Sequence, residues 1–104
     1  MSQKVATLDE VPVGEARSFV IGERPVCVVN LGEAGIRAVG DLCSHAQAWL
    51  HEGDVEIEDE TIECPSHGSA FDLNTGVPRS LPATSPVPAY TVEVVGNDIL
   101  IEVN

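Results

Sequence analysis

Two short segments, each pairing a cysteine with a histidine, constrain this chain more than any other feature. The first is Cys43–His45, with the pattern C-x-H, and the second is Cys64–His67, with the pattern C-x-x-H. Together they use two of the three cysteines and two of the three histidines in 104 residues. Thiolate sulfur and imidazole nitrogen are common protein ligands of iron and zinc. The pattern therefore predicts that the fold brings two loops together around metal.

The spacing of these residues suits two metal ions better than one. In a [2Fe–2S] rhombus each loop can send its cysteine to one iron and its histidine to the other. Cys43 and Cys64 would then share one iron, and His45 and His67 the second. A single tetrahedral zinc ion would need Cys43 and His45 to converge on one point, whereas structural zinc sites usually space paired ligands more widely. The spacing favours an iron–sulfur cluster, with zinc in the same site as the alternative.

The rest of the sequence is typical of β-structure. Short β-branched runs alternate with turn residues, and no stretch keeps a helical apolar period over the roughly ten residues that a helix needs. At most, residues 46–50 form one helical turn. The expected strands cover residues 5–8, 16–21, 25–31, 36–39, 55–57, 61–63, 90–95 and 99–103. Their regular spacing predicts an all-β fold, a small antiparallel barrel or sandwich.

The chain is expected to be a single domain over residues 1–104, because its length suffices for one core only. The stretch 78–88 holds four of the seven prolines. It predicts a stiff loop and not an interdomain linker, since the hairpin that follows is too short to fold alone.

Around the two segments the chain resembles the Rieske ferredoxin family. Residues 64–72, followed by Thr75 and Gly76, are similar to the second cluster loop of that family, and residues 81–83 lie where its members carry a proline-bearing loop over the cluster. The resemblance implies a Rieske-type antiparallel β-sandwich or barrel with a small cluster-binding subdomain formed by two loops, at about residues 40–83. It also implies one [2Fe–2S] cluster per chain. The implied ligands are Cys43, His45, Cys64 and His67.

Departures from that family predict the redox behaviour. High-potential members in respiratory complexes carry an extra cysteine in each loop, and the two form a disulfide; here Ala48 and Ser66 occupy those places. Phe71 stands where those proteins have a tyrosine that donates to the cluster. Fewer donors stabilise the reduced state less, so we expect a potential low in the Rieske range of about −150 to +300 mV. Ser69 remains as a candidate donor.

The resemblance also implies a role. Stand-alone Rieske ferredoxins of bacterial ring-hydroxylating systems carry one electron at a time from an NAD(P)H-dependent flavoprotein reductase to a terminal non-heme iron oxygenase. The chain would thus be an electron-transfer component and not itself an enzyme. Two other classes stay open: a module like the small subunit of nitrite reductase, and an accessory protein linked to iron–sulfur cluster assembly. Small subunits of that kind often lack some cluster ligands, and the intact set here weighs against the first.

Charge narrows the choice of partners. Seventeen acidic residues against five basic ones give a formal net charge of −12, which disfavours nucleic acid and anionic membranes and favours protein partners with basic docking surfaces. Residues 52–63 contain seven carboxylates. They form either a docking surface or a solvated edge that discourages sheet pairing. Without a signal sequence or a long apolar run, we expect a cytoplasmic protein. Because the sequence shows no apolar surface helix, we expect a monomer.

Three further residues were candidates for a role at the site. Cys27 lies inside an apolar run, so we expect a buried small hydrophobe. His51 follows the first segment and is expected at the surface, with a supporting or docking role as the alternative. Trp49 is expected to pack against neighbouring side chains, with shielding of the cluster or contact with a partner as the alternatives.

Overall fold

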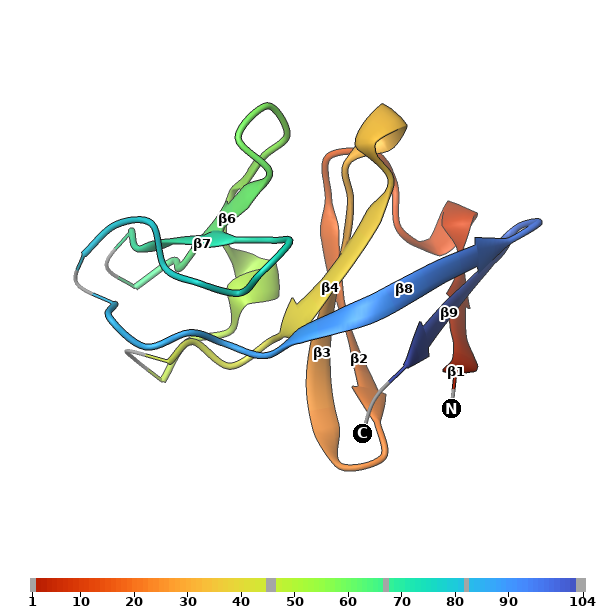
Figure 1. The fold of residues 1–104 in the computed structure, drawn as a ribbon, viewed down its shortest axis with the longest axis horizontal. Coiled ribbons are helices and arrows are strands. Elements are labelled where there is room, and N and C mark those ends of the chain that lie inside the picture. The colour runs from red at the N-terminus through yellow and green to blue at the C-terminus, as the bar shows by residue number, and fades with distance from the viewer. Residues whose placement is uncertain (1, 45–46, 67, 82, 103–104) are drawn as a thin grey trace.

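The computed structural model describes residues 2–44, 47–66, 68–81 and 83–102. Two antiparallel sheets build the fold, which confirms the predicted all-β class (Figure 1). The larger sheet has the order β1-β9-β8-β4-β3-β2 and the smaller the order β5-β6-β7. The strands of the larger sheet are β1 (Ser2–Thr7), β2 (Ala16–Ile21), β3 (Arg24–Asn30), β4 (Ile36–Gly40), β8 (Ala89–Val95) and β9 (Asp98–Glu102). Those of the smaller sheet are β5 (Val55–Glu56), β6 (Thr61–Glu63) and β7 (Ala70–Asp72).

Helical structure is confined to three short 3₁₀ turns among the described residues. They are η1 (Leu8–Glu10), η2 (Gly32–Ala34) and η3 (Leu50–Glu52). The single helical turn expected at 46–50 is displaced to η3, and residues 45–46 lie outside the described part of the chain. Across the described ranges, no helix has the length and apolar character needed to span a membrane.

Strand β3 forms the wall between two hydrophobic cores. Its side chains alternate in direction, so Val26 and Val28 pack into one core and Cys27 and Val29 into the other. The first core is formed mainly by side chains of the larger sheet and includes Ile99 and Ile101 of β9. The second core lies between the two sheets. Burial on both faces explains why residues 26–29 of β3 form an unbroken apolar run in the sequence.

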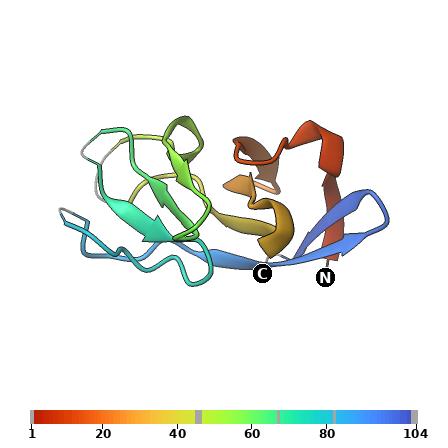
Figure 2. The same cartoon turned by 90° about the horizontal axis from the view of Figure 1, so that it is seen from above.

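The smaller sheet and its loops lie at one end of the molecule, and the β8–β9 hairpin lies at the other (Figures 1 and 2). Strand β7 was missed from the sequence, because three residues show no measurable alternation. It pairs with β6 along its whole length, including Ile62 opposite Phe71. Both of these side chains are fully buried in the core between the sheets.

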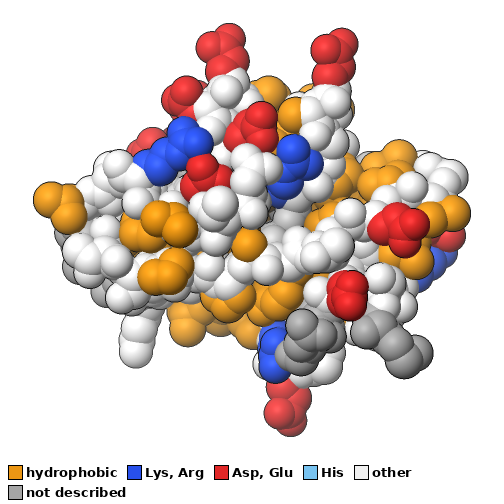
Figure 3. Space-filling view, viewed as in Figure 1, with side chains coloured by type: hydrophobic (Ala, Val, Ile, Leu, Met, Phe, Trp, Pro, Cys, Tyr) orange, Lys and Arg blue, Asp and Glu red, His pale blue; other side chains and the backbone are white. Residues whose placement is uncertain are grey.

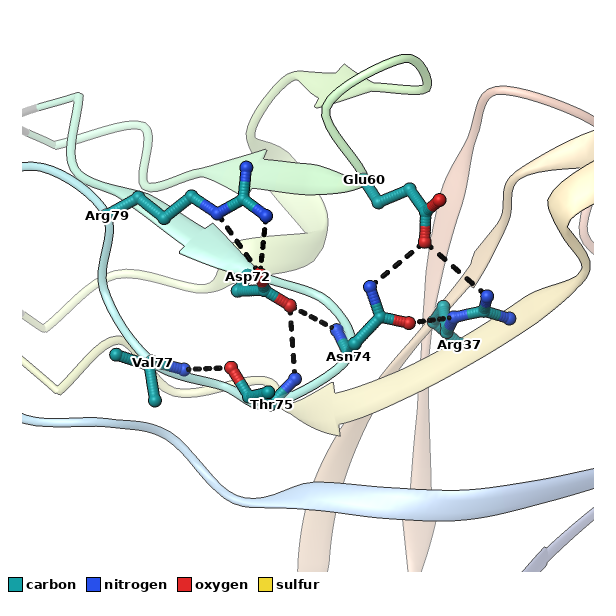
Figure 4. Close-up of polar contacts among 7 residues, drawn as sticks. All are labelled: Arg37, Glu60, Asp72, Asn74, Thr75, Val77 and Arg79. Atoms are coloured by element: carbon teal, nitrogen blue, oxygen red, sulfur yellow. Dashed lines mark hydrogen bonds and ion pairs between the residues drawn. The ribbon is translucent and has the colours of Figure 1, made fainter.

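A polar bridge joins the two sheets (Figure 4). Nε of Arg37, in β4, donates to Oδ1 of Asn74 at 2.7 Å. Nη2 of the same guanidinium group forms an ion pair with Oε1 of Glu60 at 3.5 Å. Asn74 closes the triangle by donating from Nδ2 to the same Glu60 oxygen at 2.9 Å. Glu60 itself has a left-handed backbone, with φ of 54°. The bridge fixes the end of the β5–β6 hairpin against the larger sheet.

The chain then turns around the carboxylate of Asp72. Its Oδ1 accepts from the backbone N–H groups of Asn74 and Thr75, and Arg79 donates to Oδ2 from Nη2 at 2.6 Å. Burial alone would raise the pKa of Asp72. The hydrogen bonds from Asn74, Arg79 and Thr75 outweigh it and lower the pKa below its usual range.

Candidate metal centre

The first loop, residues 43–48, leaves β4 and closes on itself. The backbone N–H of Cys43 donates to Ala48 O at 2.9 Å. Leu42 and Trp49 form an antiparallel bridge directly outside that bond, and Leu50 N donates to Asp41 O at 2.7 Å. Cys43 therefore lies at the mouth of a hydrogen-bonded stem. His45 belongs to this loop and lies outside the described residues.

The second loop, residues 64–69, joins β6 to β7 and closes in the same way. Cys64 N donates to Ser69 O at 2.7 Å, and Gly68 N donates to Cys64 O at 2.9 Å. Gly68 has a φ of 77°, a left-handed conformation that glycine adopts without steric cost. Cys64 thus occupies the position in its loop that Cys43 occupies in the first. His67 lies outside the described residues.

The fold buries the two cysteines in the same hydrophobic core. Cys43 is 4% exposed and Cys64 is 1% exposed, and both belong to the core between the sheets, as does Leu50. Neither forms a disulfide. Two buried thiols from separate loops, meeting in one core, are a donor set suited to metal.

Gly53 and Glu63 bring the stems of the two loops into close contact. Gly53 ends η3, which follows the first loop, and a Cβ at this position would lie 1.6 Å from the carbonyl oxygen of Glu63. Glu63 directly precedes Cys64, and its N–H donates to Asp54 O at 2.9 Å. Only glycine permits this approach, so the separation of the two loops depends on the missing side chain.

A covering segment, residues 78–88, is fastened to both loops. Ser44 donates from Oγ to Ser85 O at 2.5 Å, which ties the segment to the first loop. Ala83 N donates to Ser69 Oγ at 2.9 Å, which ties it to the second. Apart from the bridge at its first residue, the described part of this segment forms no strand, as expected from its prolines.

Ser69 keeps a proton to donate. Its side chain is fully buried, and its hydroxyl oxygen accepts the bond from Ala83. A hydroxyl has one O–H donor besides its lone pairs, and within the described part of the chain no group accepts that proton. Phe71, next along β7, is fully buried and offers no donor.

Cys27 is the buried small hydrophobe that the sequence predicted. It is 0% exposed within β3. Burial, and secondarily the charge of Asp41, raises the pKa of its thiol well above the usual range. Cys27 therefore remains a protonated thiol at neutral pH and is no candidate ligand.

His51 lies at the surface only in part, and its contact with Asp41 fits the alternative of a supporting role. Its side chain is 30% exposed, and its Nδ1 lies 2.6 Å from Oδ2 of Asp41, which is fully buried. The two residues are ten positions apart, and no periodic pattern relates them. Trp49 is 43% exposed and is therefore only partly packed. Leu42, its partner in the antiparallel bridge, is 50% exposed.

The two closed loops on an antiparallel scaffold can be compared with known proteins. Residues 1–91 match the family model of the Rieske [2Fe-2S] domain. The chain belongs to this family. The Rieske chain is 36% identical to the anthranilate 1,2-dioxygenase ferredoxin subunit of Burkholderia cepacia, over 95% of this chain and 89% of that protein. It is 44% identical to the 3-phenylpropionate/cinnamic acid dioxygenase ferredoxin subunit of Escherichia coli (strain K12), over 89% and 85%.

Solved structures give the same assignment. The ferredoxin of carbazole 1,9a-dioxygenase from Nocardioides aromaticivorans IC177 superposes with a TM-score of 0.91 at 40% identity, covering 97% of this chain and 96% of that one. A ferredoxin in complex with the oxygenase of carbazole 1,9a-dioxygenase superposes with a TM-score of 0.84 at 34% identity, covering 96% and 91%.

As a Rieske protein the chain carries a [2Fe–2S] cluster, and the described residues fit that group. A Rieske cluster needs two thiolates from two different loops. Cys43 and Cys64 provide two buried thiols, each at the mouth of a closed loop. The buried hydroxyl of Ser69 adds a hydrogen-bond donor on the second loop.

Proposed function

We propose that this Rieske protein is a one-electron carrier that takes electrons from an NAD(P)H-dependent flavoprotein reductase and delivers them to a terminal non-heme iron oxygenase. The observation that carries the proposal is that Cys43 and Cys64 are buried in one hydrophobic core, on a scaffold shared with the carbazole 1,9a-dioxygenase ferredoxin. The relatives named above are ferredoxin subunits of dioxygenases, that is, electron-transfer components and not the catalytic subunits.

We propose that the cluster ligands are Cys43 and Cys64 on one iron and His45 and His67 on the other. When bound, the cluster supplies a site that gains and loses a single electron. The two stems would hold the thiols in place, and the covering segment, tied by the hydrogen bonds of Ser44 and Ser69, would keep water from the buried side of the loops. The whole chain would act as one domain, with residues 40–83 as the cluster-binding part.

The proposed reduction potential is low within the Rieske range. Phe71 offers no hydroxyl to the cluster. Ala48 and Ser66 stand in place of the two cysteines that form the disulfide of high-potential members. Ser69 would donate its free O–H toward the cluster sulfur and raise the potential in part.

Carboxylates on the β5–β6 hairpin are the proposed contact for basic partners. They protrude above this hairpin in the space-filling view (Figure 3). Five of the seven carboxylates in residues 52–63 are exposed, namely Glu52, Asp54, Glu56, Glu58 and Asp59. Opposite charges on reductase and oxygenase would speed association, and this gain would fall as salt rises. We further propose that the carrier is a cytoplasmic monomer.

Electron paramagnetic resonance and electron delivery test the proposal. We expect a rhombic signal that appears only after anaerobic dithionite reduction, with an average g value below that of all-cysteine clusters. Reduced protein mixed with a ring-hydroxylating oxygenase should be reoxidised, and the rate should fall as ionic strength increases. A protein with zinc and no iron would overturn the carrier role. Cluster transfer to apoproteins without electron delivery would favour the assembly role instead.

A further inference from the structure

Asp41 is a buried charge at the start of the first loop. It follows β4 directly, is 0% exposed, and precedes Cys43 by two residues. Its backbone is fixed on both sides, because its N–H donates to Pro25 O at 3.0 Å and its carbonyl accepts from Leu50 N at 2.7 Å. Burying a carboxylate is costly unless hydrogen-bond donors surround it.

Among the residues that the structure describes, both donors to this carboxylate come from His51. The backbone N–H of His51 donates to Oδ1 at 2.8 Å, and Nδ1 of its ring lies 2.6 Å from Oδ2. The basic side chains that form ion pairs in the described ranges pair with other acids. A single residue therefore satisfies the buried charge, and its ring Nδ1 must carry a proton to do so.

These bonds form the outer end of the stem that holds Cys43. Moving inward, the stem has the Asp41–His51 contacts, then the Leu42–Trp49 bridge, then the bond from Cys43 N to Ala48 O. Because the last of these includes the backbone of Cys43, opening the outer end would loosen the inner end. The ring of His51 thus influences the position of Cys43 without contacting it.

We propose that His51 is a positioning residue, which clamps the buried carboxylate of Asp41 and so holds the first loop in the geometry that binds the cluster. This inference rests on the proposed role of Cys43 as a cluster ligand. The clamp itself is a property of the folded chain and can be measured separately.

Two substitutions separate donation from space filling. In His51→Asn the side-chain amide places an N–H close to the position of Nδ1, whereas His51→Leu has similar bulk and no donor. Both variants keep the hydrogen bond from the backbone N–H of residue 51 to Oδ1 of Asp41. A hydrogen bond to a charged group corresponds to at least about a tenfold change in an opening equilibrium. We expect that change for His51→Leu, and values within about twofold of wild type for His51→Asn.

Holoprotein of wild type and both variants is examined by amide hydrogen exchange, by iron release to a chelator, and by the resonance spectrum of the reduced cluster. In His51→Leu the amides of Cys43 and Leu50 should exchange about tenfold faster, while those of the β2–β3 hairpin stay unchanged. Iron release should quicken and the g values should shift. His51→Asn should restore all three. Effects of Asp41→Asn and His51→Leu should be non-additive in the double variant, because they remove one interaction.

Unchanged exchange and iron release in His51→Leu would overturn the clamp. So would equal effects of His51→Leu and His51→Asn, or faster exchange spread evenly over both sheets. Wild-type protein that shows no Rieske signal would refute the proposed function, and the exchange data would still decide whether His51 holds the stem.

Discussion

Replacing Gly53 with alanine should prevent the two loops from holding a cluster together. The added Cβ would lie 1.6 Å from the carbonyl oxygen of Glu63, 2.9 Å from its carbonyl carbon and 3.3 Å from Cδ of Pro65. The clashing atom is backbone and cannot swing aside as a side chain would. The stems must therefore separate.

The required movement follows from the contact distance. Real Cβ atoms essentially never approach another heavy atom more closely than 3.0 Å, so the two chains must move apart by about 1.4 Å. Metal–ligand distances tolerate deviations of roughly 0.2 Å. A shift of this size between the first loop and Cys64 is several times larger. Overpacking of this kind also costs about 1–3 kcal/mol of folding free energy.

Iron and sulfide content, together with the spectrum of the reduced protein, measure the effect. We expect Gly53→Ala to retain little cluster after purification while the larger sheet stays folded by circular dichroism. Gly22→Ala is the matched control, because Gly22 has a φ of +65° and its added Cβ would meet nothing within 4 Å. That variant should lose about 1 kcal/mol of stability from backbone strain and keep its full iron. Full iron and an unchanged spectrum in Gly53→Ala would refute the reasoning.

Four further predictions follow from the same contacts. Ser69→Ala should lower the midpoint potential in a redox titration by roughly 40 mV, the equivalent of about 1 kcal/mol for one electron; an unchanged midpoint would show that the hydroxyl does not reach the cluster. Arg37→Ala should lower the free energy of unfolding by about 1 kcal/mol in urea, because it removes the bond to Asn74, whereas exposed Arg24→Ala should stay within about 0.5 kcal/mol. A lowered pKa makes the stability that Asp72 confers fully present above its ordinary pKa of 3.8 and lost as pH falls through the lowered value. The stability difference between wild type and Asp72→Asn should thus be flat from about pH 8 to about pH 5 and should shrink below about pH 4, and a difference that stays constant below about pH 4 would contradict the lowered pKa. Removal of iron by chelation should speed amide exchange in residues 40–83 and leave the larger sheet protected, since strands of two or three residues cannot hold a sheet alone.

The sequence predicts most of the fold because the strands of the larger sheet carry their own signals. Residues 16–21 and 61–63 become strands with the expected limits, and the last hairpin forms where the glycine–asparagine turn indicates. Spacing predicted that two loops would present Cys43 and Cys64 to one site, and the fold places both in one core. In these cases the information is local.

The features that the sequence did not reveal depend on contacts between distant segments. Gly53 reads as an ordinary turn glycine until Glu63 is seen against it. Arg37 and Asn74 are 37 positions apart, and neither has a pattern that predicts the other. The sequence favours a surface position for His51 because it lies beyond the first ligand pair, and nothing in the sequence shows that the carboxylate of Asp41 is fully buried beside it. Burial of a polar group becomes visible only when the tertiary structure is known.

The position of Cys27 has a consequence for the maturation of the protein. In an unfolded chain all three cysteines are equally accessible to iron, so a product in which Cys27 is a ligand can form. Once the core between the two sheets has formed, Cys27 is a shielded, protonated thiol packed within it. Formation of this core before metal delivery therefore acts as a selection step, and reconstitution of folded apoprotein should give a more uniform product than refolding in the presence of iron and sulfide.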